Sequence, residues 1–240
     1  MQDTPRHVAI VMDGNGRWAK REHCSVLKGH QAGVKALKNI VKAAISHKIS
    51  YLSVFAFSTE NWQRSKTEVS ALMRLFVSGL KSEVPALHQE GIRLRFVGDR
   101  SRLSKRLQDA MQHAETLTHA NTRLSLVVAM DYGGRWDVVQ AAKQMAASVK
   151  SGELSPDAID EERFSRYLSG GDIPDPDLFI RTSGEERISN FYLWQLAYSE
   201  LYFTQTLWPD FDEAEFLKAL SVFSERNRRY GLRQEEETSC

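Results

Sequence analysis

Short apolar runs alternate with longer amphipathic stretches along this chain. Runs that are nearly continuous in Val, Ile, Leu and aromatic residues are typical of strands buried on both faces, as in a parallel sheet. The predicted strands are Val8–Met12, Tyr51–Phe57, Ile92–Val97, Arg123–Met130 and Leu178–Ile180. Apolar residues recur at helical spacing between them. The predicted helices are one from Gly29 onward, Glu68–Gln89, Ser101–His119, Val138–Val149, one with Pro156 in its first turn, and Asp212–Tyr230.

This alternation predicts a single α/β domain over residues 1–240, with a central, mostly parallel sheet of about six strands flanked by helices. Ala19–Lys28 is polar and irregular, and we expect a mobile loop there. The charged segment Gln234–Cys240 is expected to be disordered. The apolar surface of Glu68–Gln89 is wider than one stripe, which fits either a core helix or one wall of a cavity for a long hydrocarbon.

Composition narrows the class of protein. At 240 residues the chain can bury a substantial core. Because 32 Lys and Arg nearly balance 31 Asp and Glu, we expect no nucleic-acid partner. Two isolated cysteines, Cys24 and Cys240, fit neither a disulfide framework nor a zinc site and indicate a reducing compartment. We see no signal peptide and no apolar run of membrane-spanning length, which predicts a soluble, cytoplasmic protein.

The first predicted strand ends in a segment with candidate chemistry, Asp13-Gly14-Asn15-Gly16-Arg17. Open α/β sheets bind ligands at the carboxyl ends of their strands. A carboxylate, glycines that let a ligand approach the backbone, and a guanidinium together suggest a Mg²⁺–diphosphate site, with Asp13 holding the metal. The alternative is a tight turn in which Asp13 caps a helix and Arg17 is solvated. The segment is neither a Walker motif nor G-x-G-x-x-G.

Two further loops follow predicted strands and carry polar side chains. Ser58–Arg64 supplies a hydroxyl, an acid, an amide, an indole and a cation, although a capped turn would explain it as well. Arg181–Asn190 places two arginines and several hydroxyls around a glycine, which suggests a second phosphate cradle or an exposed loop with incidental charges. Glu200 lies among aromatic residues and is expected to meet a cation or a metal.

Taken together, these stretches resemble the motifs of the cis-prenyltransferase family, and most closely its bacterial undecaprenyl diphosphate synthases. The matching segments are 7–19 (HVAIVMDGNGRWA), 29–30 (GH), 57–62 (FSTENW), 132–137 (YGGRWD), 177–185 (DLFIRTSGE), 187–191 (RISNF), 193–195 (LWQ) and 208–209 (WP). The match spans nearly the whole chain in order, which makes it far more specific than any single motif.

The resemblance implies a Mg²⁺-dependent homodimeric enzyme that adds isopentenyl diphosphate to farnesyl diphosphate in successive cis condensations. The product it implies is undecaprenyl or another long-chain polyprenyl diphosphate, the lipid carrier for peptidoglycan and other cell-wall polymers. It also implies a hydrophobic tunnel beside the sheet. Release of a lipid product suggests peripheral contact with the inner face of the plasma membrane.

The same resemblance assigns roles to individual residues. Asp13 is implied as the essential acid at the Mg²⁺–diphosphate, Glu200 as a second metal ligand and Asn61 as the proton acceptor. An amide is a poor base at neutral pH, so Asn61 could instead orient a water or a diphosphate oxygen. The remaining implied substrate-binding residues are Gly14, Asn15, Gly16, Arg17, Trp18 and His30 around the allylic diphosphate, Ser58, Thr59, Glu60, Trp62 and Arg64 on a flexible catalytic loop, and Arg181, Arg187, Ile188 and Ser189 at the isopentenyl diphosphate.

Two positions depart from the family pattern. Val26 stands where many relatives carry an arginine, so one contact to the allylic diphosphate is expected to be missing, with Lys28 or Arg21 as candidate substitutes. Glu186 stands where some relatives have histidine, which puts the part of that position in metal binding in doubt.

Two other classes of protein share part of this pattern. A haloacid-dehalogenase-like phosphatase also has an Asp after its first strand, but it needs a second Asp two residues on, where this chain has Asn15. A non-catalytic subunit of a heteromeric prenyltransferase would share the fold but lose the metal-binding acid, whereas Asp13 is present. Product length does not follow from the sequence. We expect Leu124→Ala to lengthen the products if Leu124 closes the tunnel floor.

Overall fold

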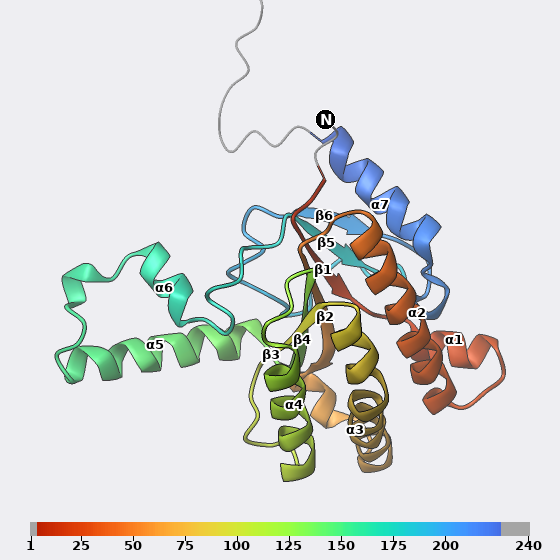
Figure 1. Cartoon of the computed structure of the whole chain (residues 1–240), viewed down its shortest axis with the longest axis horizontal. Coiled ribbons are helices and arrows are strands. Elements are labelled where there is room, and N and C mark those ends of the chain that lie inside the picture. The colour runs from red at the N-terminus through yellow and green to blue at the C-terminus, as the bar shows by residue number, and fades with distance from the viewer. Residues whose placement is uncertain (1–3, 227–240) are drawn as a thin grey trace, which may run out of the picture.

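Six strands form one sheet in the computed structural model, which describes residues 4–226 (Figure 1). They are β1 (His7–Val11), β2 (Tyr51–Ser58), β3 (Ile92–Val97), β4 (Leu124–Tyr132), β5 (Leu178–Arg181) and β6 (Glu200–Phe203). Every neighbouring pair is parallel, and the order across the sheet is β3-β4-β2-β1-β5-β6. The predicted α/β fold with a mostly parallel sheet of about six strands is therefore confirmed.

The hydrophobic pattern located five of these strands but not β6. This strand lies at the edge of the sheet, and its four residues are half-buried or exposed. A strand with no buried run gives no continuous apolar signal, so the segment shows only an excess of aromatic residues.

The helices alternate with the strands along the chain, as predicted, and only the segment that begins at Pro156 differs from the predicted type of helix. They are α1 (Asn15–Arg21), α2 (Val26–Ser46), α3 (Lys66–Gln89), α4 (Lys105–Thr118), α5 (Gly134–Lys150), α6 (Glu161–Tyr167) and α7 (Glu213–Glu225), with short 3₁₀ helices η1 (Thr59–Gln63), η2 (Pro156–Ala158) and η3 (Trp208–Asp210). Pro156 begins η2 rather than an α-helix.

The expectation of a mobile loop at Ala19–Lys28 was wrong. Most of this stretch belongs to α1 and α2, and the Ser25 hydroxyl caps α2 by accepting from the Lys28 amide at 3.3 Å. The two helices pack closely, because a Cβ added to Gly29 would lie 2.3 Å from the carbonyl oxygen of Asn15. The stretch contains the end of one helix and the start of the next, both with polar outer faces. Neither part is long enough to show a helical period in the sequence.

The final helix begins as predicted, with Asp212 as its cap: its Oδ1 accepts from the Glu215 amide at 3.0 Å. The predicted end at Tyr230 and the expected disordered segment Gln234–Cys240 lie outside the described residues.

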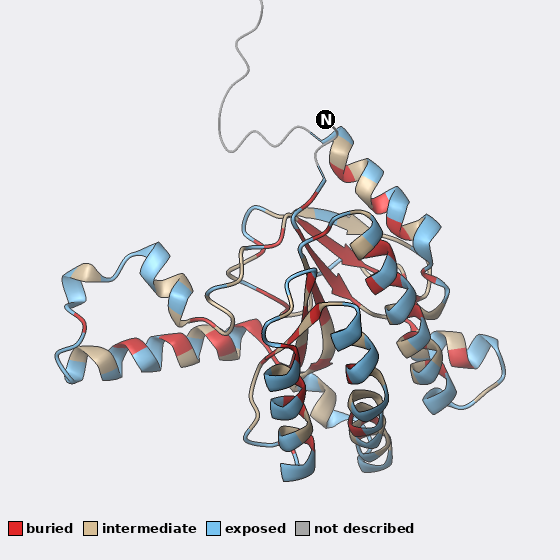
Figure 2. Ribbon diagram, viewed as in Figure 1, coloured by how far each residue is buried: buried red, intermediate tan, exposed pale blue. Residues whose placement is uncertain are grey.

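The sheet separates two cores. The larger lies under α2, α3, α4 and α7, and the smaller contains Phe179 of β5 together with Phe191, Tyr192 and Leu196. Figure 2 shows the central strands largely buried and the outer faces of the helices exposed. Helices α5 and α6 pack on each other and extend away from the sheet (Figure 1).

Among residues 4–226, none of the helices combines the length and the apolar character needed to span a membrane.

Candidate active site

Asp13 and Arg181 meet at the carboxyl edge of the sheet. β1 and β5 are neighbours, with Val11 in register with Arg181, so the residues that follow β1 lie beside the end of β5. An Nη of Arg181 donates to Asp13 Oδ2 at 3.0 Å, and the Arg181 side chain is only 5% exposed. The two loops that the sequence suggested as phosphate sites are therefore one site.

Arg181 also organises the second loop. Its other Nη donates to the Arg187 carbonyl at 2.6 Å and to Ser189 Oγ at 2.5 Å. Its Nε is buried and has no partner among the described residues. A buried donor without a partner carries a cost that an anionic ligand could remove.

A second cation lies on the other side of Asp13. Arg17 is 3.3 Å from Asp13 Oδ2 and 3.3 Å from Glu185, and it donates to the Ser183 carbonyl at 2.7 Å. Arg187 pairs with Glu185 at 2.5 Å. Three guanidinium groups thus surround one small region, with Asp13 and Glu185 as their counter-charges.

The segment between Ser58 and Arg64 has a defined conformation. The Asn61 Oδ1 accepts from the Ser58 amide at 3.1 Å in a capping box that opens η1. The indole of Trp62 is fixed by a hydrogen bond, in which its Nε1 donates to Asp131 Oδ1 at 2.9 Å. Arg64 pairs with Glu68 at 3.0 Å. This hydrogen bond fixes the orientation of the Asn61 side chain, whose amide lines the cavity.

A cavity of about 640 Å³ opens beside Asp13. Its polar lining comprises Asp13, Asn15, His30, Ser58, Glu60, Asn61, Arg64, Arg181, Ser189 and Asn190, together with Glu83 further along. Beyond the mouth it is lined by apolar side chains of α3, β2, β3 and β4, and along α3 it runs from Leu72 to Leu87. At 1.5 Å per helical residue this is a length of about 22 Å. The wide apolar surface of α3 therefore serves a cavity as well as a core.

His30 is at the mouth of the cavity, as expected for a phosphate contact. Burial, reinforced by the nearby charge of Arg64, lowers its pKa. His30 is therefore available as a neutral hydrogen-bonding group near neutral pH.

Eight of the predicted substrate-binding residues do not line the cavity. They are Gly14, Gly16, Arg17, Trp18, Thr59, Trp62, Arg187 and Ile188. Trp18 donates to Asp210 at 2.8 Å, and Arg21 forms an ion pair with the same carboxylate at 2.7 Å. Arg21 is thus engaged elsewhere. Val26, the first residue of α2, is 44% exposed and does not line the cavity.

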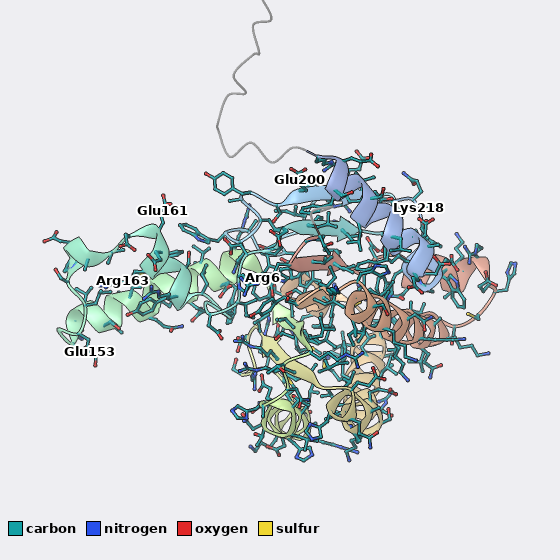
Figure 3. All side chains as sticks on the ribbon, turned by 45° about the horizontal axis from the view of Figure 1, so that its top comes forward. Arg6, Glu153, Glu161, Arg163, Glu200 and Lys218 are labelled. Carbon is teal, nitrogen blue, oxygen red and sulfur yellow. The ribbon has the colours of Figure 1, made fainter. Side chains whose placement is uncertain are left out.

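Within one chain, Glu200 does not join Asp13 as expected. Glu200 starts β6 in register with Leu178, which is in register with Val8, whereas Asp13 lies five residues further along. In a parallel sheet this puts Asp13 at the carboxyl ends of the strands and Glu200 at their amino ends, about 16 Å apart along the strand direction. Glu200 pairs instead with Arg226 at 2.8 Å, and Figure 3 shows it beside α7.

Two residues that the sequence reasoning left without a role also shape the site. Asn190 lines the cavity, and Ser183 holds Arg17 through its carbonyl and its hydroxyl. Both lie in the motif region 177–191, but the partners they bind come from distant parts of the chain, which no local pattern reveals. Among the described residues there is no cluster of three or more His, Cys, Asp or Glu that could hold a metal alone.

Comparison with known proteins identifies the family. A family profile described as "Putative undecaprenyl diphosphate synthase" matches residues 11–231. The chain is 53% identical over 227 residues to the farnesyl-diphosphate-specific ditrans,polycis-undecaprenyl-diphosphate synthase of Pectobacterium atrosepticum, covering 95% of this chain and 90% of that protein. The protein of the same name from Escherichia coli strain K12 is 53% identical over 226 residues, covering 94% and 89%.

Two solved structures share the fold. Lavandulyl diphosphate synthase from Lavandula x intermedia, in complex with dimethylallyl diphosphate, superposes with a TM-score of 0.92 at 46% identity, covering 95% of this chain and 98% of that one. A structure described as a probable undecaprenyl diphosphate synthase from Campylobacter jejuni gives a TM-score of 0.79 at 33% identity, covering 96% and 100%. The chain belongs to the undecaprenyl diphosphate synthase family of prenyltransferases.

Proposed function

We propose that this protein adds isopentenyl diphosphate to farnesyl diphosphate in repeated cis condensations and so makes undecaprenyl diphosphate, the lipid carrier precursor for cell-wall polymers. The observation that supports this most is the cavity: a mouth surrounded by arginines leads into a long apolar interior. The mouth suits a diphosphate, and the interior suits a hydrocarbon chain. The relatives in Pectobacterium atrosepticum and Escherichia coli carry this activity in their names.

Departure of the allylic diphosphate is the step that the arginines would assist. Negative charge grows on the leaving group as the new carbon–carbon bond forms. Arg17 and Arg181, both within 3.3 Å of Asp13, are fixed in place before the reaction and stabilise that charge without moving. Arg187 and Ser189 would hold the second diphosphate on the neighbouring loop. We assign to Asn61 the orientation of the group that takes the released proton.

Mg²⁺ fits this site in one way. Asp13 lines the mouth between Arg17 and Arg181, Glu60 lines it beside Asn190, and Mg²⁺ is commonly held by one or two carboxylates together with substrate phosphates and water. We therefore propose that Asp13 binds the ion carried by the diphosphate. When bound, Mg²⁺ adds positive charge that neutralises the departing group.

The apolar interior is proposed to act as the hydrophobic tunnel of the family. Burial of each CH₂ group is worth about 0.8 kcal/mol, so a growing chain would be retained between condensations. Leu124 is fully buried at the start of β4, two residues before the lining residue Leu126. Leu124 does not itself line the cavity, so we propose that it closes the floor from behind Leu126, as the expected effect of Leu124→Ala requires.

A homodimer is proposed on separate grounds. The edge strand β6 and the segment before it expose apolar side chains, with Tyr198 at 75% exposure and Leu193 and Leu201 at 37% each. Exposed edges and apolar patches are typical of protein interfaces. We further propose that the enzyme works in the cytoplasm and contacts the inner face of the plasma membrane only peripherally, where it releases its lipid product.

Primer selectivity tests the proposed function. The value of kcat/KM should be higher for farnesyl diphosphate than for dimethylallyl diphosphate, because the longer chain fills the apolar interior beyond Asp13 while both share the same diphosphate contacts. The measurement is initial-rate incorporation of radiolabelled isopentenyl diphosphate with each primer in the presence of Mg²⁺. A clear preference for dimethylallyl diphosphate would contradict the proposal and indicate a short-chain prenyltransferase instead.

A further inference from the structure

Asn190 joins three loops at the mouth of the cavity. Its Nδ2 donates to Glu60 Oε1 at 2.9 Å, and its Oδ1 accepts from the Arg135 amide at 2.9 Å. Its own carbonyl accepts from the Gly134 amide at 2.7 Å. The loop after β5 is thereby tied to the segments that follow β2 and β4.

The three loops meet with no spare room. A Cβ added to Gly133 would lie 2.7 Å from Thr59 Oγ1 and 2.8 Å from Asn190 Nδ2. At these distances, a side chain at position 133 would force the Thr59 hydroxyl or the Asn190 amide to move. The contact between the three loops is therefore a packed junction and not an incidental surface hydrogen bond.

The backbone at this turn is held in an uncommon conformation. Ser189 and Asn190 have φ values of +49° and +61°, in the left-handed region that only glycine adopts without cost and that asparagine tolerates best among the others. The hydrogen bonds of Asn190 to the other two loops hold this turn. The conformation of this turn brings the Ser189 hydroxyl to Arg181, from which it accepts a hydrogen bond.

Glu60 responds to the same contact. Partial burial raises the pKa of the Glu60 carboxyl, but the hydrogen bond from the Asn190 amide and those from nearby hydroxyls outweigh it, and the net pKa is lowered. Glu60 therefore stays ionised as the acceptor for Asn190.

We infer that Asn190 is a positioning residue: its hydrogen bond to Glu60 fixes the segment Ser58–Arg64 against the turn that carries Arg187 and Ser189. This inference rests on the proposed function, in which these two segments hold the two substrates. The reacting atoms must then be aligned across the Asn190–Glu60 contact. A displacement of about 1 Å between two bound reactants can lower the rate about 100-fold.

A reversed hydrogen bond provides the test. Asn190→Asp keeps an oxygen for the Arg135 amide but places a second carboxylate against Glu60, so the contact is lost. In a Glu60→Gln background the amide introduced at position 60 can donate to the carboxylate introduced at position 190, and the contact is restored with its polarity reversed. Asn190→Gly retains the left-handed backbone but offers no side chain to either partner.

The measurement is kcat and KM for both substrates in all single and double variants. Asn190→Asp should lower kcat about 10- to 100-fold with Glu60 present, with less effect on KM, and should cost less than about threefold in the Glu60→Gln background. Asn190→Gly should cost about the same in both backgrounds. Asn121→Asp serves as the matched control, because Asn121 bonds the Ile92 carbonyl away from the cavity.

An equal cost of Asn190→Asp in the two backgrounds, or no cost at all, would overturn the inference while leaving the proposed function intact. Absence of turnover in the folded wild-type protein would instead contradict the proposed function. Thermal unfolding of each variant separates loss of positioning from loss of the fold, and Asn190→Gly provides the second variant if Asn190→Asp does not fold.

Discussion

The guanidinium of Arg181 donates to Asp13 on one side and to Ser189 on the other. It thereby links the acid after β1 to the turn that carries the second predicted phosphate contacts. Its position follows from the parallel register of β5 with β1, in which Arg181 is the last strand residue. The side chain is buried and rigid, which suits a group that must stabilise charge without reorganising.

A second residue, His7, is expected to make the free energy of unfolding depend on pH. Its Nδ1 donates to the Pro174 carbonyl at 2.6 Å and its Nε2 accepts from Ser53 at 2.7 Å, while Tyr192 donates to Ser53 at 3.1 Å. The neutral imidazole satisfies both contacts, with one nitrogen as donor and the other as acceptor. Burial lowers the pKa of His7 from 6.5 to about 4.

We predict that this histidine makes folding pH-dependent. The folded pKa lies below the unfolded value, so the unfolded state binds the proton first, and stability present above pH 6.5 is lost as the pH falls toward 4. At 1.36 kcal/mol per pH unit the loss is about 3 kcal/mol. Urea unfolding between pH 7.5 and 4.5 should show a steeper fall for the wild type than for His7→Gln. Equal slopes would contradict the prediction.

At the scale of elements, α3 determines how much space the cavity has. Its lining residues extend over the helix from Leu72 to Leu87, and Gly79 lies among them. A Cβ added to Gly79 would meet nothing within 4 Å, so a larger side chain there would enter the cavity without displacing backbone.

Gly79→Phe is therefore predicted to shorten the products. The aromatic ring would occupy the space that later isoprene units need, while the first condensations near Asp13 would proceed. Phenylalanine has a better helix propensity than glycine, by a few tenths of a kcal/mol, so the fold should not suffer. Thin-layer separation of labelled products measures the change, and Ser78→Phe, on the exposed face of the same helix, is the control. An unchanged product distribution in Gly79→Phe would show that this space is not used.

Local patterns identified most of the elements and failed at two. The strands β1 and β5 are buried throughout, and β2, β3 and β4 are largely buried, so each carries a recognisable apolar pattern. The polar residues that follow β1, β2 and β5 were recognisable as site candidates. The edge strand β6 and the polar helix α1 carry no such signal. The family motifs supplied the residues around Asp13, but contacts such as Asn190 to Glu60 depend on strand register and loop packing, which a sequence period does not contain.

Glu200 illustrates the same limit. Its aromatic surroundings correctly predicted a charged partner, and Arg226 provides it. Its position relative to Asp13 depends on where β6 begins in the sheet, and that register separates the two carboxylates within the chain.

In the whole molecule, the parallel sheet places the candidate active site next to the apolar cavity. Its carboxyl edge gathers the loops after β1, β2, β4 and β5, and the face covered by α2 and α3 contains the apolar cavity. A diphosphate bound at this edge would therefore have its hydrocarbon chain directed along α3. The near-zero net charge leaves the arginines at the mouth as the local source of attraction for anionic substrates.

The most direct measurement is product analysis after incubation with farnesyl diphosphate, radiolabelled isopentenyl diphosphate and Mg²⁺, for wild type and Asp13→Ala. We expect a series of polyprenyl diphosphates from the wild type and a loss of at least about 100-fold in the variant, because the group proposed to bind the diphosphate-borne metal is gone. Asp172→Ala, which removes an exposed carboxylate paired with Arg95 outside the cavity, should retain the series. A folded wild type that incorporates no label would contradict the proposed function, and an Asp13→Ala variant with full activity would contradict the role of Asp13.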